Sequence, residues 1–77
     1  MASAKDMIVF AKCGLVTYYL PEDEEEDAIA SRLVKAELVV RRTDEGHCLR
    51  DSRRMVDSVK LTPKGSIFMD GILAILG

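Results

Sequence analysis

Residues 57–76 read DSVKLTPKGSIFMDGILAIL, and they join a strand pattern to a helix pattern within a few residues. Val59 and Leu61 share one face of an alternating segment, which is typical of a β-strand. Thr62 is a good helix N-cap, and Pro63 suits the first helical position, where its missing N–H is not needed. The sequence therefore predicts that a strand passes directly into a helix at this point.

The predicted last helix is apolar on more than one face. A chain of 77 residues builds only a small core, so one helix of this kind cannot hide all its apolar side chains inside it. Exposed apolar surface of this size usually marks contact with another chain. We therefore expect a protein contact or a homodimer through this helix, at Ile67, Phe68, Ile72 and Ile75.

Two helices are predicted before the junction. Helical spacing of apolar residues predicts the first over 4–19, and Pro21 stops it because the residue before a proline is pushed toward extended geometry. The second covers 22–38, EDEEEDAIASRLVKAEL, where Ile29 and Leu33 begin an apolar stripe. Its acidic start suits the positive end of the helix dipole.

A β-hairpin is predicted between the second and last helices. The β-branched segment 38–42 and the alternating segment 55–61 form its strands, and the polar residues 43–54 form a long tip. The expected order is helix, helix, two-stranded hairpin and helix. This order predicts one small α+β domain of winged-helix type over residues 1–77.

Three phrases within residues 32–65 occur in the order known from one family. LVKAELVVRR, from Leu33, is similar to the end of that family's recognition helix, and an Asp and arginines follow it in the hairpin. The phrase VKLTPKG is similar to the return strand and the next helix start. On these phrases, the segment resembles the wing region of regulators of the multiple-antibiotic-resistance (MarR) type. The matching residues are Asp51, Arg53, Arg54, Val59, Leu61, Thr62 and Gly65.

Charge is distributed unevenly along the chain, although the net charge is only −2. Residues 21–31 hold six acidic side chains and no basic ones, whereas residues 32–64 hold nine basic and five acidic side chains. The family resemblance implies contact between the basic wing and double-stranded DNA. The residues expected to contact phosphate are Arg41, Arg42, Arg50, Arg53 and Arg54, with Arg32 and Lys35 on the helix. Alternatively, the arginines pair with Asp44, Glu45 and Asp51 in a solvated hairpin tip.

The acidic run has three interpretations. It is a solvated helix start stabilised by the dipole, a docking surface for a basic protein patch, or a mimic of nucleic-acid phosphates. Carboxylates at the start of a recognition helix would repel DNA, whose binding depends on neutralising phosphates. The solvated helix start is the simplest of the three interpretations. If the run instead docks a protein, the residues expected to make the contact are Glu22, Asp23, Glu24, Glu25 and Glu26.

Catalytic and metal-binding patterns are missing from the sequence. No phosphate-binding loop, G-x-S-x-G or G-x-G-x-x-G phrase occurs. His47 and Cys48 are neighbours, so on a strand they point to opposite faces and are badly placed to act together. Two cysteines and one histidine do not supply a structural zinc site. We expect no enzyme activity, no cofactor and no metal.

Location and partners complete the expectations. Cys13 and Cys48 do not form a secreted disulfide framework, and the apolar segment near the start is too short to span a membrane. The sequence predicts a reduced, cytoplasmic protein without membrane association. The function expected first is a small winged-helix regulator associated with DNA through its basic wing. The alternative is a winged-helix protein-interaction module, such as a small phage or mobile-element effector, that uses the acidic helix start or the apolar last helix.

Overall fold

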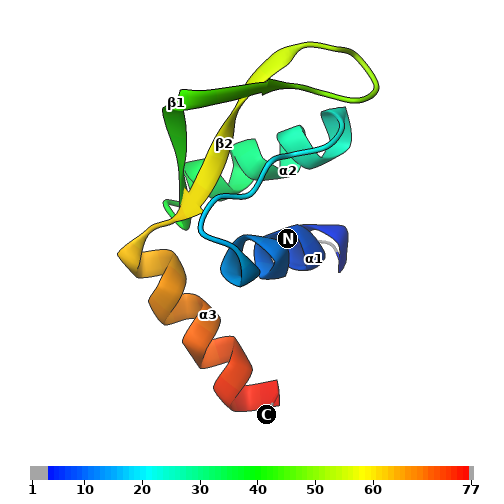
Figure 1. The fold of residues 1–77 in the computed structure, drawn as a ribbon. Coiled ribbons are helices and arrows are strands. Elements are labelled where there is room, and N and C mark those ends of the chain that lie inside the picture. The colour runs from blue at the N-terminus through cyan, green and yellow to red at the C-terminus, as the bar shows by residue number, and fades with distance from the viewer. Residues whose placement is uncertain (1–3, 77) are drawn as a thin grey trace.

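The computed structural model describes residues 4–76, the side chains of 43–45 and 76 excepted. Three helices and a β-hairpin follow one another in the predicted order (Figure 1). The expected α+β class is confirmed. Along the chain the elements are α1 (Ala4–Leu15), α2 (Glu24–Lys35), β1 (Val39–Cys48), β2 (Met55–Leu61) and α3 (Pro63–Leu76).

The sheet has three antiparallel strands, and the prediction of two was wrong. β1 pairs with β2 from Val39 opposite Leu61 to Cys48 opposite Met55. On the other edge of β2, Tyr19 forms a one-residue bridge with Val59, whose N–H and C=O bond to it at 2.9 and 2.8 Å. β2 therefore lies in the centre of the sheet.

Helix α1 ends at Leu15 and not at residue 19, because Tyr19 is paired with Val59 of β2 and cannot also be helical. Gly14 and the β-branched pair Val16 and Thr17 are weak helix formers. Tyr19 can therefore leave the helix and pair with β2. This correction also places Tyr18 and Tyr19 on opposite faces of the sheet, since successive strand residues alternate.

Both ends of helix α2 have clear local causes. Asp23 has extended backbone angles, and its carboxylate accepts the Glu26 N–H at 2.8 Å, which makes it the N-cap. Glu37 has a φ of 65° directly after the C-cap Ala36, so it turns the chain out of the helix. The helix is shorter than the predicted 22–38, and the strand that follows is longer than 38–42.

The core is built by α1, α2 and the sheet, whereas the described side chains of α3 that pack against it are the partly buried Met69 and Ile72. Figure 1 shows α3 projecting from the base of the sheet, away from the hairpin tip. Ile67 is 73% exposed and Ile75 is 84% exposed. The core cluster contains Val9, Phe10, Cys13, Ile29, Ala30, Leu33, Val39 and Val59, and Leu49 and Val56 of the hairpin are buried as well.

The junction of β2 with α3 matches its prediction. The hydroxyl oxygen of Thr62 accepts the Gly65 N–H at 2.9 Å, and the helix begins at Pro63. Gly65 is needed for close packing, because a Cβ at this position would lie 2.0 Å from the Leu38 carbonyl oxygen. Within residues 4–76, no helix has the length and apolar content needed to cross a bilayer.

Candidate functional site

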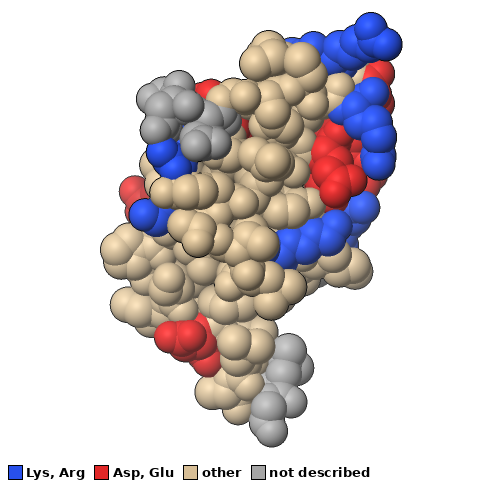
Figure 2. All heavy atoms as spheres, viewed as in Figure 1, with Lys and Arg blue, Asp and Glu red and all other residues tan. Residues whose placement is uncertain are grey.

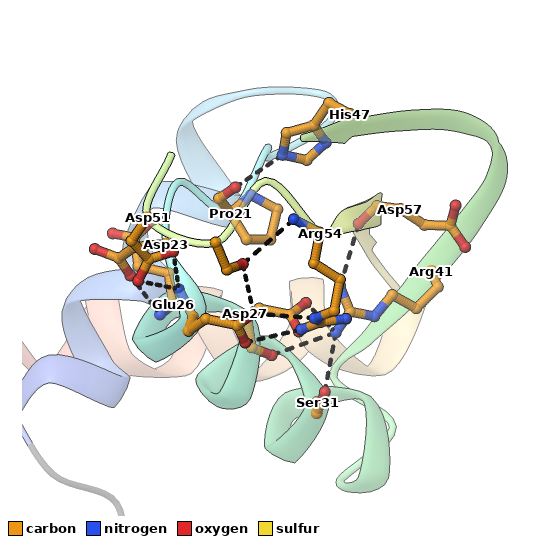
Figure 3. Close-up of polar contacts among 12 residues, drawn as sticks. Pro21, Asp23, Glu26, Asp27, Ser31, Arg41, His47, Asp51, Arg54 and Asp57 are labelled. Atoms are coloured by element: carbon orange, nitrogen blue, oxygen red, sulfur yellow. Dashed lines mark hydrogen bonds and ion pairs between the residues drawn. The ribbon is translucent and has the colours of Figure 1, made fainter. Parts of the chain in front are cut away.

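The acidic start of α2 faces the arginines of the hairpin (Figure 3). We use the name charge network for the ion pairs of Arg41, Arg50 and Arg54 with Glu22, Asp23, Glu24 and Asp27. Arg54 donates from Nε and Nη2 to the two carboxylate oxygens of Glu24, both at 3.0 Å. The same Nη2 also contacts Asp27. Ser52 adds a hydroxyl bond to Glu24 at 2.7 Å. These bonds lower the pKa of Glu24 to about 2, the bond from Arg54 being the largest cause.

Asp27 lies at the centre of the charge network and is only 6% exposed. Arg41 Nη2 forms an ion pair with Asp27 Oδ1 at 2.8 Å, although the two atoms are not aligned as a hydrogen bond. Arg41 also donates to the Ser31 hydroxyl at 3.0 Å and to the Asp57 carbonyl at 3.1 Å. Two arginines from the hairpin thus compensate one nearly buried carboxylate on α2.

Glu26 is also nearly buried, and it accepts bonds from three directions. Tyr19 donates its hydroxyl at 2.6 Å, the Glu22 N–H donates at 3.0 Å, and Lys12 donates at 3.2 Å. Burial alone would raise the pKa of Glu26, but these bonds outweigh it and hold the pKa below its usual value. Burial, followed by the hydrogen bond to Glu26, raises the pKa of the Tyr19 hydroxyl. Glu26 therefore joins α1, the Tyr19 bridge and α2.

The rest of the acidic run is engaged as well. Arg50 pairs with Glu22 at 3.4 Å and with Asp23 at 3.6 Å, and Lys5 pairs with Glu25 at 3.5 Å. Every carboxylate from Glu22 to Asp27 consequently has a basic partner within the chain. Asp51 caps the same helix end, since both its carboxylate oxygens lie 3.1 Å from the Glu24 N–H.

Of the residues expected to contact phosphate, Arg41, Arg50 and Arg54 lie in the charge network. Arg32 makes a two-bond pair with Asp6, the shorter bond being 2.7 Å. The guanidinium of Arg42 lies 3.9 Å from the ring centre of Tyr18. Arg53, with a φ of 58°, and Lys35 are exposed. The alternative partners Asp44 and Glu45 fall outside the described side chains.

Figure 2 shows the result on one face of the molecule: basic and acidic side chains interleave over the start of α2 and the hairpin. A polar hollow of about 420 Å³ opens there, lined by Asp27, Arg41, Arg54 and Asp57 among others. Its arginines are bonded to the aspartates or to the Asp57 carbonyl beside them. The hollow is therefore a gap within the charge network.

His47 and Cys48 take separate positions. His47 Nε2 lies 2.8 Å from the Pro21 carbonyl, to which it donates, and the Cys48 thiol lies 3.1 Å from the Met55 sulfur. Cys13 and Cys48 are both free thiols. Burial raises the pKa of Cys13 to about 11, with Glu26 adding to the effect. Among the described residues, no group of three His, Cys, Asp or Glu is placed to hold a metal ion.

An apolar surface lies at the other end of the molecule, between α1 and α3. Phe10 and Phe68 meet there with ring centres 5.8 Å apart. Two hollows of about 380 and 230 Å³ share Met7 and Phe10 in their linings. We call this surface the α1–α3 groove; its apolar lining residues include Met7, Ile8, Phe10, Phe68, Met69, Ile72 and Leu73.

The α3 side of this groove contains Phe68 and Ile72, which the sequence predicted as contact residues. Its α1 side was missed, because Met7 and Ile8 look like part of an ordinary amphipathic helix. In Figure 2 the described part of the surface around α3 is mostly uncharged, apart from one acidic patch. Comparisons of the chain with protein families, curated proteins and solved structures gave no match.

Proposed function

We propose that this protein is a small non-enzymatic interaction module that binds an apolar segment of another protein in the α1–α3 groove. The observation that carries the proposal is the exposed apolar lining of this groove, with Met7, Ile8, Phe68 and Leu73 all exposed. Contiguous apolar surface on a small domain usually marks a binding site. Two adjoining hollows suit a helical or extended segment with two apolar anchors.

The polar residues at the groove are already bonded to each other, which favours an apolar partner. Asp6 and Arg32 line the larger hollow, but they are bonded to each other at 2.7 Å. The described residues that line the smaller hollow are all apolar and belong to α1 and α3. Recognition by charge is therefore weak, and burial of apolar side chains would supply the affinity.

The acidic start of α2 is a poorer docking surface than the groove. Its carboxylates have basic partners within the chain, so a basic patch on another protein would have to displace them. The same pairing weakens the interpretation that the run mimics phosphates. We therefore assign protein binding to the groove and internal stabilisation to the acidic run.

Association with duplex DNA is the second candidate, and the fold would then be a winged helix with β1 and β2 as the wing. One observation favours it: Arg42 and Lys60 lie 3.9 and 6.0 Å from the ring centre of Tyr18, on one face of the sheet. Against it, Asp51 and Arg54 cover the start of α2, the helix end that reads bases in helix-turn-helix proteins. DNA binding therefore ranks second.

The test of the first candidate uses variants on the groove and a matched control. Ile8→Glu and Leu73→Glu place a charge at the smaller hollow, whereas Ser66→Glu places one on an exposed part of α3 outside it. A partner captured by the immobilised wild-type chain is purified and its affinity measured by calorimetry. We expect the two groove variants to lose about 30-fold or more in affinity and the control to keep it.

Two results would decide against this proposal. Equal affinity of the groove variants and the wild-type chain would move the binding site elsewhere. Duplex binding that persists at physiological salt, in the absence of any protein that binds the purified chain, would establish the second candidate.

A further inference from the structure

Close packing within the monomer does not require a glycine at position 71. Gly71 lies inside α3, and a Cβ built at this position would meet nothing within 4 Å. Glycine inside a helix destabilises it relative to alanine because the backbone loses more freedom on folding. The fold itself therefore gives no reason for this residue. Glycine does have a use where a second backbone must approach closely.

The exposed side of α3 is arranged evenly around Gly71. Successive residues are about 100° apart around a helix axis, so Ile67 and Ile75 lie about 40° to either side of Gly71. Phe68 and Ala74 lie about 60° to either side by the same geometry. We call these five residues the outer face of α3; Gly65, Met69 and Ile72, which face the body, lie about 100° or more away from Gly71.

This even arrangement fits a second copy of the chain. If two α3 helices cross in opposite directions at Gly71, each residue faces the residue equally far from Gly71 on the other helix. Ile67 then faces Ile75 of the other copy, and the large ring of Phe68 faces the small side chain of Ala74. A surface that complements itself in this way forms a two-fold interface, where residue i meets j and j meets i.

Charge favours the same arrangement. α3 has no acidic residue in its first turn and no basic residue in its last turn, so side chains do not compensate its dipole. An antiparallel copy places the opposite pole at each end. Asp70, the neighbour of Gly71, lies about 100° around the helix and outside the outer face. Lys64 lies about 20° from Gly71 around the axis, but it is seven residues away along α3 and pairs with Glu37 at 3.6 Å, so like charges do not meet at the crossing.

We propose that the protein forms a homodimer in which the outer faces of two antiparallel α3 helices pack with Gly71 at the crossing point. This proposal goes beyond the proposed function and shares only Phe68 with it, because the other groove residues of α3, Met69, Ile72 and Leu73, lie about 100° or more from Gly71 around the helix. The two surfaces adjoin only at Phe68.

Sedimentation equilibrium of the purified full chain tests the dimer, from micromolar to millimolar concentration. The wild-type chain should dimerise, and Gly71→Arg should raise the dissociation constant about 30-fold or more. Arginine is a good helix former and has free space at this site, so circular dichroism should show an intact fold. Ser66→Arg, with the same charge about 140° away around α3, should dimerise like the wild-type chain.

Crosslinking tests the direction of the helices, in a Cys48→Ser background. A mixture of Ile67→Cys and Ile75→Cys chains should oxidise to a mixed disulfide dimer far faster than either chain alone. A wild-type chain that is monomeric throughout, or a dimer indifferent to Gly71→Arg, would overturn the proposal. Faster crosslinking of each single variant with itself would overturn the antiparallel arrangement.

Discussion

At the residue scale, Glu26 joins three parts of the chain through one nearly buried carboxylate. It is 3% exposed, and its partners come from α1, the Tyr19 bridge and the turn before α2. Its carboxylate must be ionised to keep all three bonds at full strength, since bonds to charged acceptors are stronger than neutral ones. Protonation of one side chain therefore loosens three parts of the chain together.

The first prediction concerns acid. The folded-state pKa of Glu26 lies below its unfolded value of about 4.3, so its contribution is present above that pH and is lost as pH falls through the folded pKa. Glu24, with a pKa of about 2, acts in the same direction. We expect the free energy of unfolding to decrease from about pH 5 toward about pH 2. Urea titrations at several pH values measure it, and a flat profile would contradict the role of both carboxylates.

The second prediction compares the two neighbouring tyrosines. Tyr19→Phe removes the 2.6 Å bond to Glu26 and should cost about 1.5–3 kcal/mol of stability, as expected for a bond to a charged group. Tyr18→Phe keeps the ring under Arg42 and should change stability by less than about 0.5 kcal/mol. Urea unfolding of both variants checks this, and equal effects would contradict the assigned role of Tyr19.

At the element scale, α3 carries two glycines with opposite roles. Gly65 lets the first turn of α3 pack against the Leu38 backbone, where a Cβ would come within 2.0 Å of a carbonyl oxygen. Backbone cannot move aside as a flexible side chain can. Gly71 faces open space in the monomer.

The third prediction follows from this difference. Gly65→Ala should destabilise the protein by about 1–3 kcal/mol or more through overpacking. Gly71→Ala should stabilise the monomer by up to about 1 kcal/mol through helix propensity. Thermal unfolding at a concentration low enough to keep the chain monomeric checks both signs. A stable Gly65→Ala variant would show that the strand–helix junction is looser than the structure indicates.

At the scale of the whole molecule, the charge network holds the hairpin against α2. Arg54 and Glu24 are 30 residues apart in sequence, and Arg41 and Asp27 also join the two elements. The nearly buried Asp27 makes the network sensitive to loss of a partner, because removing one side of a buried pair leaves a charge without compensation. The basic hairpin and the acidic run thus stabilise each other.

The fourth prediction tests this coupling. Arg41→Met should lower the free energy of unfolding by about 1–3 kcal/mol. This is less than the cost of leaving a buried charge without any partner, because Arg54 still contacts Asp27. Arg53→Met changes an exposed arginine of the same hairpin, and its free energy of unfolding should stay within about 0.5 kcal/mol of the wild-type value. Chemical denaturation of both proteins provides the measurement. An Arg41→Met variant as stable as the wild-type chain would mean that the charge network contributes little to stability.

Local sequence rules predicted the features that depend on neighbouring residues. The bounds of β2, the Thr62 cap and the start of α3 at Pro63 all follow from residues close in sequence. The Tyr19 bridge could not be predicted in this way, because it joins residues 40 positions apart through backbone atoms alone. Its only local signal was the β propensity of GLVTYYL, which competed with a helical spacing.

The candidate site was also predicted only in part, because one side of it depends on contacts between helices that are distant in sequence. The surplus of apolar residues in α3 is visible in the sequence, so Phe68 and Ile72 could be named. Met7 and Ile8 of α1 become part of a groove only when α3 packs beside them. Likewise, the uneven charge along the chain was plain, but the pairing of its two halves depends on the hairpin folding over the start of α2.

A salt titration of duplex DNA binding tests most directly the central claim, that the hairpin arginines serve the fold and not DNA. Fluorescence anisotropy of a labelled duplex is followed against the wild-type chain from about 50 to 200 mM salt. We predict no binding tighter than about 10⁻⁴ M, the weak end of non-specific association. Micromolar binding that weakens steeply with salt, and that Arg53→Glu with Arg54→Glu abolishes in a folded variant, would contradict the claim.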